Sequence, residues 1–292
     1  MISIESARSA GTWKGRQRIF SGQLLLGSGS PSVSKLAEYA QSLIDEYFHP
    51  LEPCTAQHEI DVDDFIARVA PLKSRFTNSQ RSKELIQEIA QEFGCDANTT
   101  YFDVPRLRVV PSGTYLSSGV SYAYKAHRDT WYSSPSAQLN WWLPVFSVTQ
   151  DRAMSIFPGY WDKAVQNSSE DFDYQEWCET GRKLAVQQVA VDARKHPLPL
   201  QPINLESEIR FAGGPGDLLL FSAAQLHATA PNTSGQTRFS IDFRTVDIDD
   251  LLNNRGAPNI DGKARGSTLG DFFRVRDFEP VPASLSRSGA PE

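Results

Sequence analysis

The sequence predicts a mainly β protein with helical support, built on a double-stranded β-helix (jelly-roll) core. Helix-type apolar periodicity dominates residues 1–100, and short β-branched or aromatic runs dominate the chain after Phe102. Helices followed by many strands are typical of antiparallel β structure braced by helices. A double-sheet roll of eight strands is the architecture that best fits this order of elements.

Three helices are expected before the strands. Residues 31–47 begin with Pro-Ser and carry apolar side chains at helical spacing. Residues 61–71 begin with an aspartate that suits an N-cap, and the proline at position 71 predicts the end of that helix. Residues 79–94 begin with a serine and finish on a glycine, the usual residue after a helix C-terminus. We expect these helices to support the sheet and assign them no chemistry.

The strands are expected where β-branched and aromatic residues gather between turn signals. The sequence Gly213-Gly214-Pro215-Gly216-Asp217 is the strongest turn signal and is followed directly by an apolar run. A weaker helical periodicity covers residues 174–191. The expected strands are 106–110, 121–126, 137–146, 218–222 and 237–246.

One domain is expected over residues 1–279. It comprises a helical lead-in at 1–100, the strands, and a long irregular insertion at 147–210 that forms a lid over one end of the roll. The last segment, 280–292, is rich in Pro, Ser and Ala, and we expect it to be disordered.

The composition of the chain limits the classes of function that it can have. The chain has 292 residues, 40% of them hydrophobic, and a formal net charge of −6 without any block of basic residues, which argues against nucleic acid as a partner. The N-terminus lacks the apolar core of a signal peptide, and no apolar run is long enough to span a membrane. The widely spaced Cys54, Cys95 and Cys178 indicate neither disulfides nor a zinc ribbon. We expect a cytoplasmic protein acting on a small molecule, of unpredicted oligomeric state.

Three residues far apart in the sequence suggest a metal centre. His127 and Asp129 stand two positions apart, so an extended backbone directs both side chains to one face. His227 follows a strand and can supply a third ligand. Two imidazoles and one carboxylate form the face that holds non-haem Fe(II) with open positions for chemistry. Five histidines in a chain of this length make a His-x-Asp triplet common by chance, so the metal centre is supported by the spacing of the pair together with the third ligand.

Arg238 suggests an anion site beside that metal. It begins the strand after His227, and Ser240 lies on the same face because side chains alternate along a strand. A guanidinium with a neighbouring hydroxyl suits a buried carboxylate. An ordinary surface arginine is the competing interpretation.

With these residues together, the sequence resembles the iron(II)- and 2-oxoglutarate-dependent dioxygenases, in particular the phytanoyl-CoA hydroxylase-like branch. The resemblance depends on His127-Arg128-Asp129, on the Gly216-Asp217 turn before His227, and on Arg238 with Ser240, and it covers roughly residues 105–246. It implies that the triad holds Fe(II), that 2-oxoglutarate chelates the iron while Arg238 and Ser240 bind its far carboxylate, and that O₂ is consumed.

The resemblance also implies an outcome. 2-Oxoglutarate is decarboxylated to succinate, and the substrate is oxidised, most simply by hydroxylation of an unactivated C–H bond. In the related halogenases a small residue stands at the place of Asp129, so the carboxylate argues against halogenation. Asn140 and Thr229 are expected to contact 2-oxoglutarate, with Gln138 as a weaker candidate. Trp131 and Tyr132 are expected to wall the substrate site.

Two alternatives stay open at this point. The first is a jelly-roll binding protein without redox chemistry, in which the triad is structural or holds zinc. The second is a cupin-like iron dioxygenase that does not use 2-oxoglutarate. Arg238 and Ser240 favour the 2-oxoglutarate enzyme over both. The substrate is not readable, and a secondary-metabolite or amino-acid-derived compound is favoured because the insertion 147–210 is rich in aromatic residues.

Overall fold

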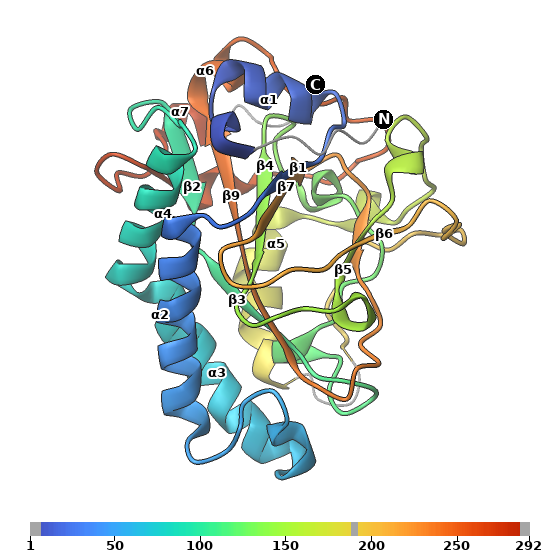
Figure 1. Ribbon diagram of the computed structural model, residues 1–292. Coiled ribbons are helices and arrows are strands. Elements are labelled where there is room, and N and C mark those ends of the chain that lie inside the picture. Colours follow the sequence, from blue (N-terminus) through green and yellow to red (C-terminus); the bar gives the residue numbers. More distant parts are fainter. Residues whose placement is uncertain (1–6, 188–191, 287–292) are drawn as a thin grey trace.

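The computed structural model describes residues 7–187 and 192–286. It contains two antiparallel sheets of seven and three strands, with helices α2, α3 and α4 along one flank of the larger sheet (Figure 1). Helix accounts for about 37% of the chain and strand for about 20%, so the expected antiparallel sheets and helical support are present but the structure is not mainly β. No helix among the described residues is long and apolar enough to cross a bilayer.

The larger sheet has the order β1-β7-β4-β9-β2-β10, with β3 also paired to β9. The smaller sheet has the order β6-β5-β8. The longest strand, β9, pairs with β4 along most of its length and with β3 and β2 at its two ends, so it positions the site residues that it carries. The strands are β1 Leu25–Gly27, β2 Thr100–Asp103, β3 Arg106–Val110, β4 Leu139–Pro144, β5 Met154–Ile156, β6 Ile209–Phe211, β7 Leu218–Ser222, β8 His227–Thr229, β9 Arg238–Asp247 and β10 Phe272–Arg274.

The three expected helices are present, each with the N-cap that satisfies a free backbone N–H. The side chains of Ser30, Asp61 and Ser79 accept from Val33, Asp64 and Ser82 respectively. The α-helices are α1 Trp13–Phe20, α2 Pro31–Phe48, α3 Val62–Asn78, α4 Gln80–Glu92, α5 Tyr174–Glu179, α6 Ile248–Leu252 and α7 Ala283–Ser286.

Two expected elements differ from the structure. Helix α3 continues through Pro71 to Asn78 instead of ending there. Pro71 lies on the exposed side while Leu72 and Phe76 extend the buried stripe, and this packing outweighs the lost hydrogen bond. Residues 121–126 were expected to form a strand but contain only the end of a 3₁₀ turn, η3 (Gly119–Ser121), followed by irregular backbone.

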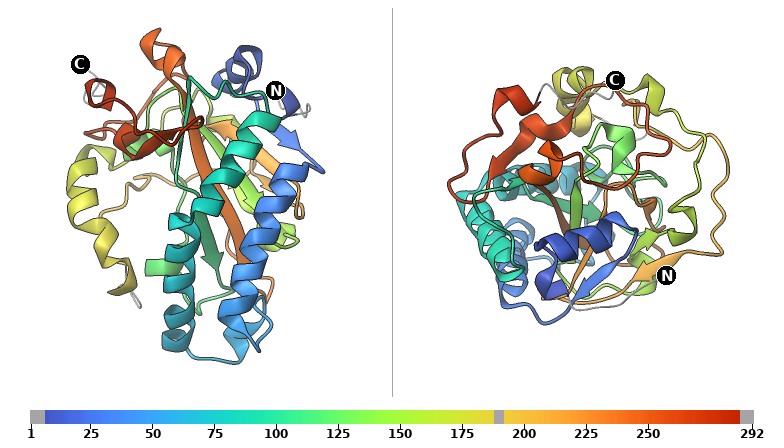
Figure 2. Two further views of the ribbon diagram at one scale, coloured as in Figure 1. Left: turned by 90° about the vertical axis from the view of Figure 1, so that its left-hand side faces the viewer. Right: turned by 90° about the horizontal axis from the view of Figure 1, so that it is seen from above.

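The main core lies between the larger sheet and helices α2–α4, which cover the face turned toward the viewer in the left panel of Figure 2. Trp141 is buried in this core, where its ring meets Phe93 edge-on and stacks on Phe243. Its neighbour Trp142 points to the opposite face of β4, toward the smaller sheet. One face of the larger sheet is therefore closed by helices, and the other is left for a cavity.

The segment 147–210 is only partly an insertion. Strand β5 and most of β6 lie within it and form the smaller sheet with β8. The stretch between them includes α5 and the 3₁₀ helix η8 (Gly181–Gln187), where helical periodicity was expected; residues 188–191 lie outside the described residues. At the C-terminus, Val281 is buried against Phe272 and Leu269, and α7 follows, so 280–286 are ordered; 287–292 lie outside the described residues.

Candidate metal centre and cavity

The two histidines of the predicted triad are brought together by the backbone. His127 and His227 form an antiparallel bridge in which each N–H donates to the carbonyl of the other at 2.9 Å. Residues paired in this way direct their side chains to the same side. The two imidazole rings accordingly lie with their centroids 4.2 Å apart.

Asp129 completes the cluster at the start of the 3₁₀ turn η4 (Asp129–Tyr132). Its backbone N–H donates to the carbonyl of Ala223, which fixes the turn against the residues that precede His227. Oδ1 of Asp129 lies 3.5 Å from Nε2 of His127 and 3.6 Å from Nε2 of His227. All three side chains are buried, and the three candidate ligand atoms lie within 4.8 Å of one another. They can therefore reach a single metal ion.

Hydrogen bonds behind the triad fix which atoms face its centre. Nδ1 of His127 lies 2.7 Å from the carbonyl of Lys125, and Nδ1 of His227 lies 2.9 Å from that of Gln225. A carbonyl only accepts, so each Nδ1 carries a proton and Nε2 is the ring atom left to face the centre of the triad. Orientation of this kind by a second group is typical of metal-ligating histidines.

The carboxylate of Asp129 is held in the same manner. Its Oδ2 accepts from the amides of Gln138 at 3.0 Å and Asn140 at 2.9 Å, and Arg244 lies 3.5 Å away. Burial alone raises the pKa of Asp129, but Arg244 and the imidazoles outweigh it and hold that pKa well below its usual range. Burial, reinforced by His127, lowers the pKa of His227 to about 3. At neutral pH the site therefore offers a carboxylate and an unprotonated His227, the forms that bind metal.

Arg238 lies in the wall of a cavity of about 680 Å³ that also includes the triad. Its guanidinium lies over the ring of Trp142, and Nη1 donates to the carbonyls of Ala153 at 2.8 Å and Arg152 at 3.3 Å. Its Nε is buried and has no partner among the described residues, and the same is true of Oγ of Ser240. Burial, reinforced by Arg108, lowers the pKa of Arg238 to about 10. A buried cation next to an unpartnered hydroxyl fits the carboxylate of a bound organic acid.

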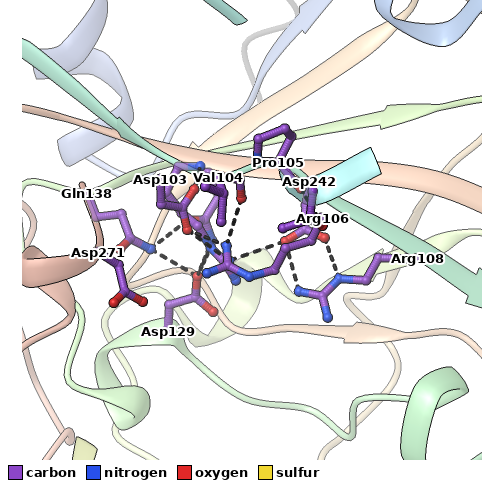
Figure 3. A network of polar contacts seen from close by, with 12 residues as sticks. Asp103, Val104, Pro105, Arg106, Arg108, Asp129, Gln138, Asp242 and Asp271 are labelled. Atoms are coloured by element: carbon purple, nitrogen blue, oxygen red, sulfur yellow. Dashed lines mark hydrogen bonds and ion pairs between the residues drawn. The ribbon is translucent and has the colours of Figure 1, made fainter. Parts of the chain in front are cut away.

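The other charged side chains on the Arg238 face of β9 are Asp242 and Arg244, and both are paired; Figure 3 labels Asp242 with its partner Arg108. Asp242 accepts from Nε and Nη2 of Arg108 in a bidentate pair. Arg244 lies within ion-pair distance of Asp103, Asp242 and Asp129. The guanidinium of Arg244 thus connects the metal-binding carboxylate to β2, and through Asp242 and Arg108 the network continues to β3.

The remaining predicted site residues divide in two. Tyr132 and Thr229 line the cavity, and so does Asn140, whose amide is engaged by Asp129. Ser240 is fully buried and does not line the cavity, although it lies on the same strand face as Arg238. Trp131 does not line the cavity: it is fully buried, donates to Asp261 and packs against Phe157 and Leu226. The prediction that it walls the substrate site is corrected, because the 3₁₀ turn sends adjacent side chains to different sides.

Several cavity residues were missed or given no role from the sequence. Asp242 and Arg244 continue the alternation that begins at Arg238 and Ser240, so the strand period could have found them. Lys73 falls on the buried stripe of α3, where a lysine is itself a signal. Of the aromatic wall only Tyr132 was predicted, because the other members come from two further segments: Tyr122, Tyr124, Phe172 and Trp177.

Comparisons with known proteins assign no family. No family model matches the chain, and no curated protein matches it. Among solved structures, a non-heme monooxygenase named ThoJ, in its apo form, is similar at 13% identity over 80% of this chain and 76% of its own, with a TM-score of 0.45. The epimerase SnoN, in complex with Fe³⁺, alpha ketoglutarate and nogalamycin RO, is similar at 13% identity over 87% and 97%, with a TM-score of 0.44.

A third similar structure is EvdO2 from Micromonospora carbonacea var. aurantiaca complexed with 2-oxoglutarate, at 13% identity over 80% and 90%, with a TM-score of 0.46. Since these TM-scores lie below 0.5, the likenesses carry no conclusion about this chain. Its function has to be inferred from its own residues.

Proposed function

We propose that this chain is an Fe(II)- and 2-oxoglutarate-dependent oxygenase, of the phytanoyl-CoA hydroxylase-like branch, that hydroxylates an unactivated C–H bond of a small molecule. One observation carries the proposal. A buried His-Asp-His cluster and the buried Arg238, which has no carboxylate partner among the described residues, line the same cavity. The first suits a divalent metal with open positions, and the second suits the free carboxylate of an acid that chelates it.

Each residue has a defined task in this proposal. His127, Asp129 and His227 hold the iron through two Nε2 atoms and Oδ1. Arg238 binds the far carboxylate of 2-oxoglutarate, with Ser240 offering its hydroxyl. When bound, iron and 2-oxoglutarate together supply oxidation by O₂, with carbon dioxide and succinate as co-products. The two sheets are proposed as the halves of a double-stranded β-helix in a single domain over residues 1–279.

The cavity supports a small organic substrate of intermediate polarity. Its volume of about 680 Å³ suits a drug-sized molecule and leaves room beside a co-substrate. Phe172 and Trp177, from the segment 147–210, close it on one side, and the ring of Phe172 meets Tyr132 at 5.2 Å. We propose that this segment is the lid and that a ring-containing secondary metabolite or amino-acid-derived compound is the substrate.

The polar residues next to the triad have more specific tasks. Asn140 is expected to fix the free oxygen of Asp129, a role the observed hydrogen bond supports better than direct contact with 2-oxoglutarate. Thr229 lines the cavity and remains a candidate for the co-substrate. Tyr132, which lies between the lid and His127, is expected to contact the substrate.

The proposal is tested by turnover. Iron-loaded protein should convert 2-oxoglutarate to succinate in an O₂-dependent reaction, slowly without a substrate and faster with one. Asp129→Ala should abolish this conversion while circular dichroism stays unchanged, and the exposed Asp162→Ala is the matched control. Full conversion by Asp129→Ala would exclude the triad. Turnover of a substrate that needs iron but no 2-oxoglutarate would favour a cupin-like dioxygenase, and zinc binding without turnover would favour a binding protein.

A further inference from the structure

Lys73 is a lysine on the buried face of a helix. Helix α3 buries Phe65, Ile66, Val69, Leu72 and Phe76, and Lys73 falls among them by helical spacing. Its side chain reaches past the helix into the wall of the cavity that holds the triad. The ammonium donates one hydrogen bond to the carbonyl of Val120. Because an ammonium has three donors, this bond leaves two of them for other acceptors.

The other cations of the cavity are, with one exception, paired with carboxylates. Arg106 pairs with Asp103, Arg108 with Asp242, Arg182 with Asp271, Arg194 with Asp192, and Arg244 with three aspartates. Among the cavity-lining residues that the structure describes, Lys73 and Arg238 are the cations without an ion pair. The proposed function assigns Arg238 to the co-substrate, so Lys73 is left for something else.

Burying the ammonium of Lys73 costs free energy in the protein without a ligand. Burial, reinforced by the like charge of Arg108 and opposed by Asp242, lowers its pKa to about 7. A leucine or methionine would fill the same place on the apolar stripe without that cost. An anion in the cavity offsets it, since an opposite charge favours the protonated ammonium.

The surroundings show how such a ligand would lie. Tyr124 connects the Lys73 side of the cavity with the triad. Its hydroxyl accepts from Arg108 at 3.4 Å, and its ring lies 5.3 Å from that of His127. Tyr122 meets Tyr124 edge-on and is stacked on His196. The path from the carbonyl of Val120 beside Lys73 to the triad is therefore lined by aromatic faces, which favour a flat apolar body.

We infer that Lys73 is the anion-binding subsite for the primary substrate, which is a ring-containing molecule bearing a carboxylate or phosphate. The anionic group binds the ammonium at α3, and the body lies along Tyr122 and Tyr124 toward the triad. This inference deepens the proposed function, because it names the class of substrate for the same cavity.

The test uses two probes of equal shape, naphthoate and its neutral amide, naphthamide. Binding to the metal-free protein is measured by calorimetry, so neither iron nor 2-oxoglutarate turnover is needed. Wild-type protein should prefer the acid by about tenfold or more, the worth of one charge-assisted hydrogen bond. The preference should disappear in Lys73→Met and persist in Lys73→Arg. It should also persist in Lys35→Met, the same change at an exposed lysine of α2.

Arg238→Met separates the two unpaired cations. The acid preference should survive in this variant, because the acid is held at Lys73. If Arg238→Met removes the preference and Lys73→Met does not, or if wild-type protein shows no preference for the acid, the inference is wrong. A failure of 2-oxoglutarate to bind iron in the intact protein would instead overturn the proposed function and leave this comparison readable.

The dependence on pH provides a second readout that does not rely on variants. The charged groups acting on Lys73 are Arg108 of β3, Asp242 of β9 and Arg194, and each is held in an ion pair. Burial and Arg194 lower the pKa of nearby His196 to about 4, so it stays neutral. Naphthoate affinity should therefore be constant from about pH 5 to 7 and fall above pH 7 by about the factor that the ammonium contributes, while naphthamide affinity stays flat. A flat profile for the acid contradicts the inference.

Discussion

Arg238 and Arg244 project from the same face of β9 into the same cavity, yet their surroundings are opposite. Arg244 lies within ion-pair distance of three carboxylates. Arg238 has backbone carbonyls and an aromatic face, with one nitrogen left unpartnered among the described residues. The paired arginine is suited to holding protein groups in place, whereas the unpaired one is suited to holding a ligand. One strand therefore carries two arginines with different roles, one structural and one suited to ligand binding.

The largest effect is expected from removing Arg244, the arginine with three carboxylate neighbours. Arg244→Met leaves Asp103, Asp129 and Asp242 without their common counter-charge, and removing one member of a buried ion pair costs about 3–5 kcal/mol. Urea unfolding should show a loss in this range. Arg274→Met, which breaks an exposed pair with Asp277, should cost less than about 1 kcal/mol. Equal losses in the two variants would mean that the network does not stabilise the fold.

Removing Arg238 should change the binding of 2-oxoglutarate rather than the stability of the fold. Arg238→Met removes a cation that has no carboxylate partner in the part of the chain that the structure describes, so the free energy of unfolding should change little or increase. The 2-oxoglutarate concentration needed for half-maximal binding to the iron-loaded protein should rise about a hundredfold, as expected when a buried charged contact is lost. A large loss of stability with an unchanged 2-oxoglutarate requirement would reverse the comparison.

A smaller effect is expected from the amides that hold Asp129. Asn140→Leu removes one donor to Oδ2 and should weaken Fe(II) binding about tenfold, the lower range for residues that orient a metal ligand. Gln138→Leu is the matched variant, since it donates to the same oxygen. Similar losses of iron affinity support a positioning role for both. A higher 2-oxoglutarate requirement in Asn140→Leu alone would return Asn140 to the co-substrate.

The smallest effect is expected in acid, where the free energy of unfolding loses the contribution of the ion-paired Asp242. Although burial raises the pKa of Asp242, Arg108 and Arg244 outweigh it and hold that pKa far below the ordinary value near 3.8. A carboxylate with a lowered folded-state pKa stabilises the protein above its unfolded pKa and loses this contribution as the pH falls. The stability difference between wild type and Asp242→Asn should therefore be constant from pH 7 to about 5 and shrink by about 1 kcal/mol or more below pH 4. A difference independent of pH would contradict the pairing.

Features set by residue spacing within one element could be predicted from the sequence. Strand β3 and strand β7 were predicted to the residue, and so were the N-caps of α3 and α4, Asp61 and Ser79. The spacing of His127 and Asp129 was enough to place two side chains together, and the alternation along β9 put Arg238 and Ser240 on one face. These predictions needed only local geometry.

Features that depend on contacts between distant segments could not be predicted. Residues 121–126 have strand-like composition, but they run along the cavity without strand pairing. Trp131 is buried in a small core and donates a hydrogen bond to Asp261, which is distant in the sequence. Two of the three ion pairs of Arg244 join it to Asp103 of β2 and Asp129 of η4, so the pattern within β9 could not reveal them.

The most direct test of the central claim is an anaerobic titration of metal-free protein with Fe(II) and then 2-oxoglutarate, followed by visible absorption. The account predicts a charge-transfer band when the co-substrate chelates the iron, and a band that needs about a hundredfold more 2-oxoglutarate in Arg238→Met. Iron binding without any band would contradict the 2-oxoglutarate assignment, and failure to bind iron at all would contradict the assignment of His127, Asp129 and His227 as a metal centre.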